Sequence, residues 1–351
     1  MPAGAIVVAD PPNADFPQPS AIEIYECVGR PTEYVLSYGI DIADGTLPLL
    51  EDAAVGPDTI LSVIAEVDDV QDCLVKGPVF AQSIKIAHGG EGSSVLVVGG
   101  DTRIAMDRAS KAKVYPEGTD SDAVQSVFGP YHLTPDVVPT DGHYSEETHA
   151  LVQRETDFEL VQRLARQNGF LFWITAGVDG VETGHFKPPV LAGEPAAQLA
   201  INQADSNTIT ELAIDWNVHT ASATVAKQID LSNGDTLDGS RTESTLVALG
   251  QTALAGVVTE PNSRLLAVPA DDVGALMGHS DGLLLESTFF ITARCETTTS
   301  VAKKILRAHT LVEIVGAGTR HSGLYYCAAV RHTITDTEHT MDLTLLRNGW
   351  N

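Results

Sequence analysis

The sequence predicts a mainly β protein that carries an α+β insertion between two β-barrel regions. Aromatic residues make up only 6% of the chain, and its 30 glycines and 18 prolines are scattered along it. This composition is typical of many short strands joined by turns. Short runs rich in β-branched residues fill residues 21–100 and 201–351, whereas the clearest helical pattern lies between these two regions.

We divide the chain into four segments, because 351 residues suit two or three domains better than a single core. Residues 1–20 contain five prolines and are predicted to form an extended N-terminal arm. A first β-barrel domain is predicted over residues 21–110, an α+β insertion over 111–200 and a second β-barrel domain over 201–351.

Five strand-like runs indicate the first barrel. Alternation at Tyr34, Leu36, Tyr38 and Ile40 has the period of a half-buried strand. The glycine-rich break at residues 88–92 predicts a hairpin loop. A small antiparallel barrel or sandwich is therefore expected. The runs are AIEIYECV from residue 21, EYVLSYGIDI from 33, TILSVIAEV from 59, KGPVFAQSIKIA from 76 and SSVLVVGGD from 93.

The insertion is recognised by its helix signals. The strongest has a hydroxyl at the N-cap and a carboxylate three residues later, which is the spacing of a capping box. The predicted helix runs to about residue 168, is followed by a strand over 170–174, and has shorter helices before it at 101–108 and 123–128. We expect its role to be domain packing. The residues of this motif are Thr156, Asp157, Phe158 and Glu159 at the start, Leu164 on the apolar face and Gly169 at the left-handed C′ position.

The second barrel is predicted from further strand runs. Residues 207–219 and 222–230 predict a hairpin, and a helix interrupted by three glycines is expected over 271–285. Strands are expected over 287–296, 310–315, 323–335 and 340–347. A hairpin turn that enters a core strand is expected at Ser322, Gly323, Tyr325 and Tyr326.

Charge and cysteine content exclude several classes of protein. Lys and Arg number 21 and Asp and Glu 47, a net charge of −26, so specific nucleic-acid binding is not expected. The charge fits either solubility, including a salt-adapted source, or a surface past which DNA or acidic cargo slides. The four cysteines lie far apart and are expected to be reduced. No membrane insertion and no signal peptide are predicted, so assembly in the cytoplasm is expected.

No catalytic, cofactor-binding or metal-binding residue is predicted. The chain lacks GxSxG, P-loop, HExxH and strand-associated GxGxxG motifs. His143 and His149 do not share a helical face. His309, His321 and His332 would have to converge from successive strands, without a carboxylate or thiolate spaced to complete a site. The sequence therefore favours a protein that is not an enzyme.

Two groups of segments are distinctive when taken together and in order. The first group comprises VLVVGGD (95–101), GTDSD (118–122), LTPDV (133–137) and QRETDFELVQRLARQNGF (153–170). The second comprises ILRAHTLVEI (305–314), RHSGLYY (320–326), VRHT (330–333) and LLRNG (345–349). Both groups resemble the phage late control protein D family, which is related to the hub part of type VI secretion spikes and to hubs of contractile injection systems. Family members often have glycine where His309 stands.

This resemblance, over residues 30–351, implies a baseplate hub that joins a hexameric inner tube to a trimeric spike. It implies two tube-like barrels per chain, a homotrimer that presents six barrels, and a central channel for DNA or cargo. Implied partners are the inner tube protein, the spike protein, other baseplate components, and a tape measure protein or cargo in the lumen. The spike is expected to be a separate polypeptide, since the sequence stops at residue 351.

Two other functions stay open at this point. A tail-associated effector or cell-wall hydrolase would require a cleft with perturbed acidic residues. A surface-binding adhesin would require an exposed aromatic platform, whereas the chain has only three tryptophans, Trp173, Trp216 and Trp350.

Overall fold

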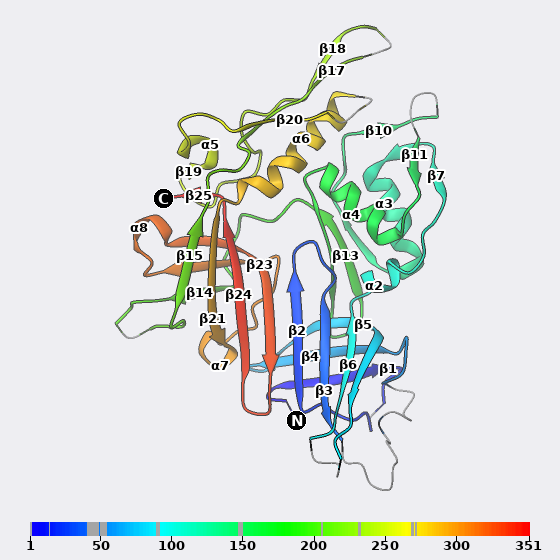
Figure 1. The fold of residues 1–351 in the computed structure, drawn as a ribbon, viewed down its shortest axis with the longest axis vertical. Coiled ribbons are helices and arrows are strands. Elements are labelled where there is room, and N and C mark those ends of the chain that lie inside the picture. Colours follow the sequence, from blue (N-terminus) through cyan, green and yellow to red (C-terminus); the bar gives the residue numbers. More distant parts are fainter. Residues whose placement is uncertain are drawn as a thin grey trace.

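The computed structural model describes residues 2–13, 15–40, 49, 55–88, 92–146, 150–204, 206–230, 233–267, 270 and 272–351. Its main feature is a long, largely antiparallel β-sheet that runs through two β units, with an α+β insertion packed beside them (Figure 1). The predicted fold class, mainly β with an α+β insertion, is confirmed. The glycine-rich loop predicted at residues 88–92 lies partly outside the described residues.

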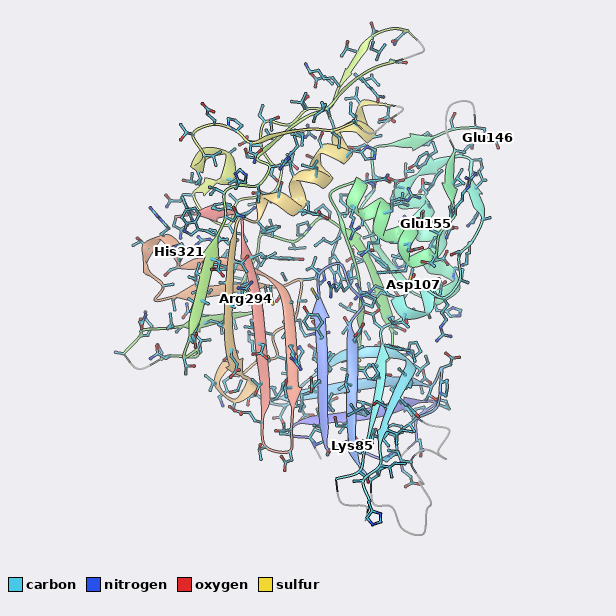
Figure 2. The ribbon with its side chains drawn as sticks, in the orientation of Figure 1. Lys85, Asp107, Glu146, Glu155, Arg294 and His321 are labelled. Atoms are coloured by element: carbon cyan, nitrogen blue, oxygen red, sulfur yellow. The ribbon has the colours of Figure 1, made fainter. Side chains whose placement is uncertain are left out.

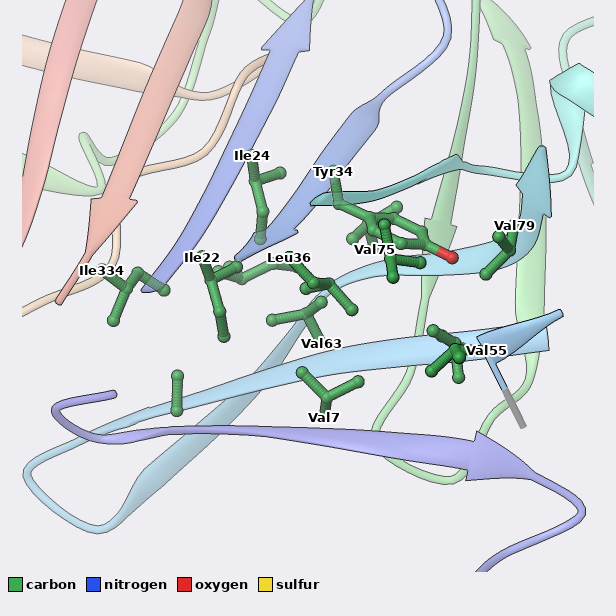
Figure 3. Packing of buried hydrophobic residues seen from close by; sticks show 14 of the residues in the cluster. Val7, Ile22, Ile24, Tyr34, Leu36, Val55, Val63, Val75, Val79 and Ile334 are labelled. Carbon is green, nitrogen blue, oxygen red and sulfur yellow. The ribbon is translucent and has the colours of Figure 1, made fainter. Parts of the chain in front are cut away.

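The first β unit contains, among the described residues, six strands in the order β1-β4-β5-β6-β3-β2. Strand β5 pairs with β4 as far as Pro78 and with β6 from Val79, so the sheet folds over one core (Figure 3). Inward residues such as Ile22 and Leu36 are completely buried there. The strands are β1 (Ala5–Asp10), β2 (Ala21–Cys27), β3 (Glu33–Gly39), β4 (Ile60–Val67), β5 (Val70–Lys85) and β6 (Ser94–Gly100).

The N-terminal segment differs from the predicted extended arm over residues 1–20. Ala5–Asp10 forms β1, which pairs along its whole length with β4. Val7 lies opposite Val63 and is buried in the first core (Figure 3). The run AIVVAD was not recognised as a strand because it is short and followed by prolines.

The second β unit has six strands in the described part of the chain. Strand β23 pairs with β24 on one side and, through its first residues, with β22 on the other. The four strands predicted near the C-terminus are confirmed as β21 to β24. The strands are β14 (Ala197–Ala200), β15 (Leu212–Trp216), β21 (Ile291–Thr298), β22 (Leu311–Val315), β23 (Gly323–Ile334) and β24 (His339–Arg347); two helical turns, α7 (Thr299–Ala302) and α8 (Gly318–His321), join them.

The two β units meet edge to edge. Strand β2 pairs antiparallel with β23, from Ile22 opposite Ile334 to Cys27 opposite Ala329. The backbone N–H of Ala3 also donates to the carbonyl of Thr335 at 2.6 Å. We call the β2–β23 pairing the seam. Because of it, the hydrogen-bond ladder continues from one unit into the other.

The insertion has its own core, formed by buried residues such as Phe128, Leu160, Leu164 and Phe186. Helix α4 begins with the predicted capping box: Glu159 N–H donates to Thr156 Oγ1 at 3.1 Å, and Thr156 N–H to Glu159 Oε2 at 3.0 Å. The elements are α2 (Arg103–Met106), β7 (Lys113–Tyr115), β8 (Gly118–Thr119), α3 (Asp120–Phe128), the 3-10 helix η2 (Gly129–Tyr131), β9 (Thr134–Val137), β10 (His143–Tyr144), β11 (Leu151–Gln153), α4 (Asp157–Gln167), β12 (Leu171–Ala176) and β13 (Glu182–Lys187).

The hairpin predicted between residues 207–219 and 222–230 is wrong. Strand β15 pairs with β21 instead, because its partly buried side chains complete the second core. Residues 217–290 form an excursion between these two strands. It contains β16 (Ala223–Val225), β17 (Lys227–Ile229), β18 (Thr236–Asp238), β19 (Thr252–Ala253), α5 (Leu254–Val257), β20 (Ser263–Leu265) and α6 (Val273–Thr288); β25 (Gly349–Trp350) pairs with β19.

Helix α6 confirms the helix predicted near residues 271–285 and explains its glycines. A Cβ atom on Gly282 would lie 1.9 Å from the carbonyl oxygen of Arg166, at the end of α4. Gly169, at φ +66°, follows α4 and faces the backbone of Asp281. The glycines therefore allow the two helices to approach closely, which outweighs their low helix propensity.

We predict that Gly282→Ala lowers the free energy of unfolding by about 1–3 kcal/mol, although alanine is the better helix former. The added methyl group would collide with backbone, which cannot rotate away as a side chain can. Urea unfolding at pH 7 measures the effect. Gly129→Ala is the control, because a Cβ there meets nothing within 4 Å. A Gly282→Ala protein as stable as the control variant would contradict the prediction.

Candidate functional site: arginine joints between the units

Three arginines with little or no exposure lie where the parts of the chain meet, and we call these places the arginine joints. Arg103 joins the first β unit to the insertion, Arg307 joins the two β units, and Arg347 joins the second β unit to the excursion. Arg103 and Arg347 are 2% and 0% exposed. The side chain of Arg307 is 19% exposed.

The Arg103 joint is built on the end of β6. Arg103 Nε and Nη2 donate to the Asp101 carboxylate at 3.0 and 2.6 Å. Asp101 also accepts from the backbone N–H of Thr32 at 2.7 Å, and Arg103 Nη1 donates to the carbonyl of Phe172 at 3.2 Å. The buried ion pair is therefore completed by backbone groups of both the first β unit and the insertion, as a stable buried pair requires.

The Arg307 joint lies beside the seam. Arg307 Nε donates to Glu26 Oε1 at 2.6 Å, and Nη1 to Asp72 Oδ1 at 2.8 Å. Its guanidinium also donates to the carbonyls of Cys73 and Leu74 on β5. Burial raises the pKa of Glu26, although Arg307 opposes this shift. Burial alone would lower the pKa of Arg307, but the two carboxylates raise it.

The Arg347 joint uses carbonyl oxygens. Arg347 donates to Leu249 at 3.0 and 3.1 Å, to Ser322 at 3.0 Å and to Arg320 at 3.3 Å. Its guanidinium lies 5.3 Å from the ring centroid of Tyr325. Gly323, at φ +127°, leaves room for this group, because a Cβ atom there would lie 2.9 Å from Arg347 Nη2.

An aromatic stack connects the insertion to the second β unit. Trp173 lies between His185 and His309, with ring centroids 4.6 and 4.1 Å apart. His309 Nδ1 is 2.9 Å from the hydroxyl of Tyr326, and burial lowers the pKa of His309 well below its usual value. His309 has φ +66°, a conformation that favours glycine, and its ring stacks on Trp173 from this backbone position.

A buried histidine pair lies next to the Arg307 joint. His332 Nδ1 on β23 is 3.0 Å from His339 Nε2 on β24, and His332 Nε2 is 3.9 Å from Glu26 Oε1. Burial lowers the pKa of His332 well below its usual value and that of His339 to about 4. Both imidazoles are therefore neutral at pH 7.

The residues singled out in the sequence separate into two places. Ser322, Gly323 and Tyr325 gather around Arg347, and Tyr326 belongs to the aromatic stack. The others lie in the insertion: Thr156 and Glu159 at the cap of α4, Leu164 in the core, half-buried Phe158 against Phe172, and Gly169 beside α6.

Asp157 is buried, and its environment is more specific than the sequence indicated. Its carboxylate accepts hydrogen bonds from Gln153 at 2.8 Å, from Tyr131 at 2.8 Å and from Lys111. Burial opposes ionisation, but these hydrogen bonds lower the pKa of Asp157 below its usual value. The first turn of α4 is therefore fixed to the rest of the insertion by a charged group.

The arginine joints were not predicted, although the strand pattern contains a signal for two of their charged residues. Glu26 follows Ile22 and Ile24 at the same two-residue period, and Arg347 follows Leu343 and Leu345. A charged residue in phase with buried positions of a strand is expected to be paired in the core. Arg294, which is labelled in Figure 2, differs from these residues because it lies on β21 with a side chain that is 60% exposed.

The histidines considered for a metal site do not form one in the described residues. His309 and His332 lie in the two separate arrangements above, and His149 is outside the described residues. No cluster of three or more His, Cys, Asp or Glu side chains suited to a metal ion is found in the described part of the chain. Over the same residues, no helix has the length and apolar character needed to span a membrane.

Solved structures with a similar fold include tail proteins. A tail protein from Neisseria meningitidis aligns over 99% of this chain and 97% of its own, with TM-score 0.67 and 13% identity. The 43 kDa tail protein of prophage MuSo2 from Shewanella oneidensis covers 99% of both chains, with TM-score 0.65 and 13% identity. The E. coli protein c3393, described as a type VI secretion component similar to T4 tail proteins gp27 and gp5, has TM-score 0.57 and 10% identity, over 99% of this chain and 76% of its own.

At sequence identities of 10–13%, these structural similarities show a shared fold and nothing more. A search of curated proteins finds no match. A family model described as the Alg8 N-terminal domain, in contrast, matches residues 30–336, which include the whole insertion and most strands of both β units, but not β1, β2 or β24. The chain belongs to the Alg8 N-terminal domain family.

Proposed function

We propose that this protein is the structural baseplate hub of a contractile phage tail or contractile injection system, where it joins the hexameric inner tube to the trimeric spike. The observation that carries the proposal is the presence, among the described residues, of two six-stranded β units in one chain, fused through the seam. The resemblance to the late control protein D family is part of this proposal.

The proposed symmetry of the assembly would explain why one chain contains two β units. Each β unit is proposed to be a tube-like barrel, and a homotrimer would then present six such units around a central channel. One face of this ring would match a sixfold tube, and the other would match a threefold spike. The arginine joints support this role, because a hub must hold its two units at a fixed angle while both faces are loaded.

The comparisons support a tail structural role at the level of fold. The matching solved structures are described as tail proteins or as a type VI secretion component. We propose a protein without enzymatic activity that is assembled in the cytoplasm and contacts the inner tube protein, the spike and other baseplate components. A tape measure protein or cargo would occupy the lumen, and the net charge of −26 would keep acidic cargo from adhering.

The test is assembly. The purified full chain should form a trimer by mass photometry and light scattering. When it is mixed with the inner tube and spike proteins of its own particle, cryo-electron microscopy should show a six-lobed ring between them. A monomer that binds neither protein would overturn the proposal. Peptidoglycan hydrolysis by the purified chain would instead support an effector.

A further inference from the structure

A cavity of about 560 Å³ opens where the first β unit, the second β unit and the helices meet. Its walls are mainly apolar, and its volume lies within the range of sites that hold small ligands. Small residues on β23 provide much of the space: Ala328 and Ala329 lie there, next to a β-bulge that follows Cys327. Large apolar side chains, among them Phe170, Leu285 and Phe289, also line it.

The charged residues that line the cavity are two arginines, Arg30 and Arg166, and one acid, Glu286. Arg30 has an exposed side chain and forms no ion pair or side-chain hydrogen bond with the described residues. Arg166 is only weakly paired, at 3.8 Å from Glu286, and both side chains are more than 60% exposed. In a chain with 21 basic and 47 acidic residues, an arginine left without a carboxylate beside an apolar cavity is unusual.

The loop that carries Arg30 is held in place. Gln162 Nε2 on α4 donates to the carbonyl of Gly29 at 2.6 Å, which fixes the loop that carries Arg30 against the helix. A ligand in the cavity would therefore meet mainly apolar walls and a cation carried by a loop that is held in place.

We propose that this cavity binds an aliphatic carboxylate, with the alkyl chain inside and the anionic head at Arg30. The positive charge of Arg30 determines the class of ligand. Arg30 would repel an alkylammonium head, and an alcohol would leave the Arg30 guanidinium without an anionic partner. The site does not depend on the proposed hub function, and its failure would leave that proposal intact.

The reactivity of one cysteine, Cys27, can report whether a ligand occupies the cavity. Cys27 lines the cavity and is half-buried, whereas Cys73, Cys295 and Cys327 are buried. Alkylation of the full chain by iodoacetamide, followed by peptide mass spectrometry, should modify Cys27 first. Saturating dodecanoate should slow the modification of Cys27 at least about tenfold, and dodecanol should have a much smaller effect.

Variants separate the site from nonspecific binding. Arg30→Gln should weaken dodecanoate binding about tenfold, since a hydrogen bond to a charged group is lost. Arg331→Gln removes an exposed arginine that is paired with Glu23 on the seam, and it should bind dodecanoate as the wild type does. Isothermal titration calorimetry measures both affinities.

Three results would overturn the proposal. The first is a Cys27 that is not alkylated in the ligand-free protein, which would mean that the cavity is closed to small molecules. The second is equal protection of Cys27 by dodecanol and dodecanoate. The third is the same affinity for dodecanoate in the wild type and in Arg30→Gln.

Discussion

Replacing Arg307 by methionine should lower the free energy of unfolding by about 3–5 kcal/mol at pH 7. The substitution leaves Glu26, which is 5% exposed, without its cation. It also removes hydrogen bonds to the carbonyls of Cys73 and Leu74. Urea unfolding followed by circular dichroism measures the difference.

Arg294→Met is the matched control for this substitution. Arg294 pairs with Asp215 at 3.0 Å, but the two side chains are 60% and 72% exposed. Loss of this ion pair should therefore lower the free energy of unfolding by less than about 1 kcal/mol. Adding Glu26→Gln to Arg307→Met should restore part of the lost stability, because the unpaired buried charge is then removed. Equal losses in Arg307→Met and Arg294→Met would contradict the role of the joint.

The buried histidine pair should make the protein lose stability between pH 6.5 and about pH 4. Burial lowers the pKa of His339 from 6.5 to about 4, so the unfolded chain binds a proton in this range before the folded chain does. The contribution of His339 to the free energy of unfolding is fully present above pH 6.5. It falls by about 3 kcal/mol as the pH decreases to about 4. His332 should act in the same direction.

Unfolding free energies measured in urea at half-unit steps from pH 4 to 7.5 test this prediction. His339→Gln should reduce the slope of stability against pH, because its amide does not titrate. His219→Gln is the control, because His219 is exposed. If the His339→Gln protein shows the same slope as the wild type, the histidine pair does not carry the pH dependence.

Secondary structure was predictable from the sequence where apolar residues recur with a clear strand period or where helix-capping residues are present. The runs that became β2, β3 and β6 alternate in their buried residues, and α4 has both its capping box and its C′ glycine in the sequence. Such features are local, because each depends on residues within a few positions of one another.

What the sequence could not reveal was pairing between distant segments. The alternation of β15 predicts a strand but says nothing of its partner, and proximity in sequence wrongly favoured residues 222–230. The joint of Arg307 with Glu26 and Asp72 depends on three segments that meet only in the fold. The glycines of α6 have a low helix propensity, and the reason for their presence, the close approach of α4, is a tertiary contact that the sequence does not show.

The seam has a consequence for biosynthesis. Ile22 finds its partner Ile334 only after more than 300 further residues have been synthesised and have left the ribosome. Until then one edge of β2 exposes unpaired backbone groups, which is the condition under which nascent strands aggregate. Since loops of this length close slowly, completion of the sheet should be a late, post-translational event, and truncation before β23 should yield an insoluble product and not a smaller folded one.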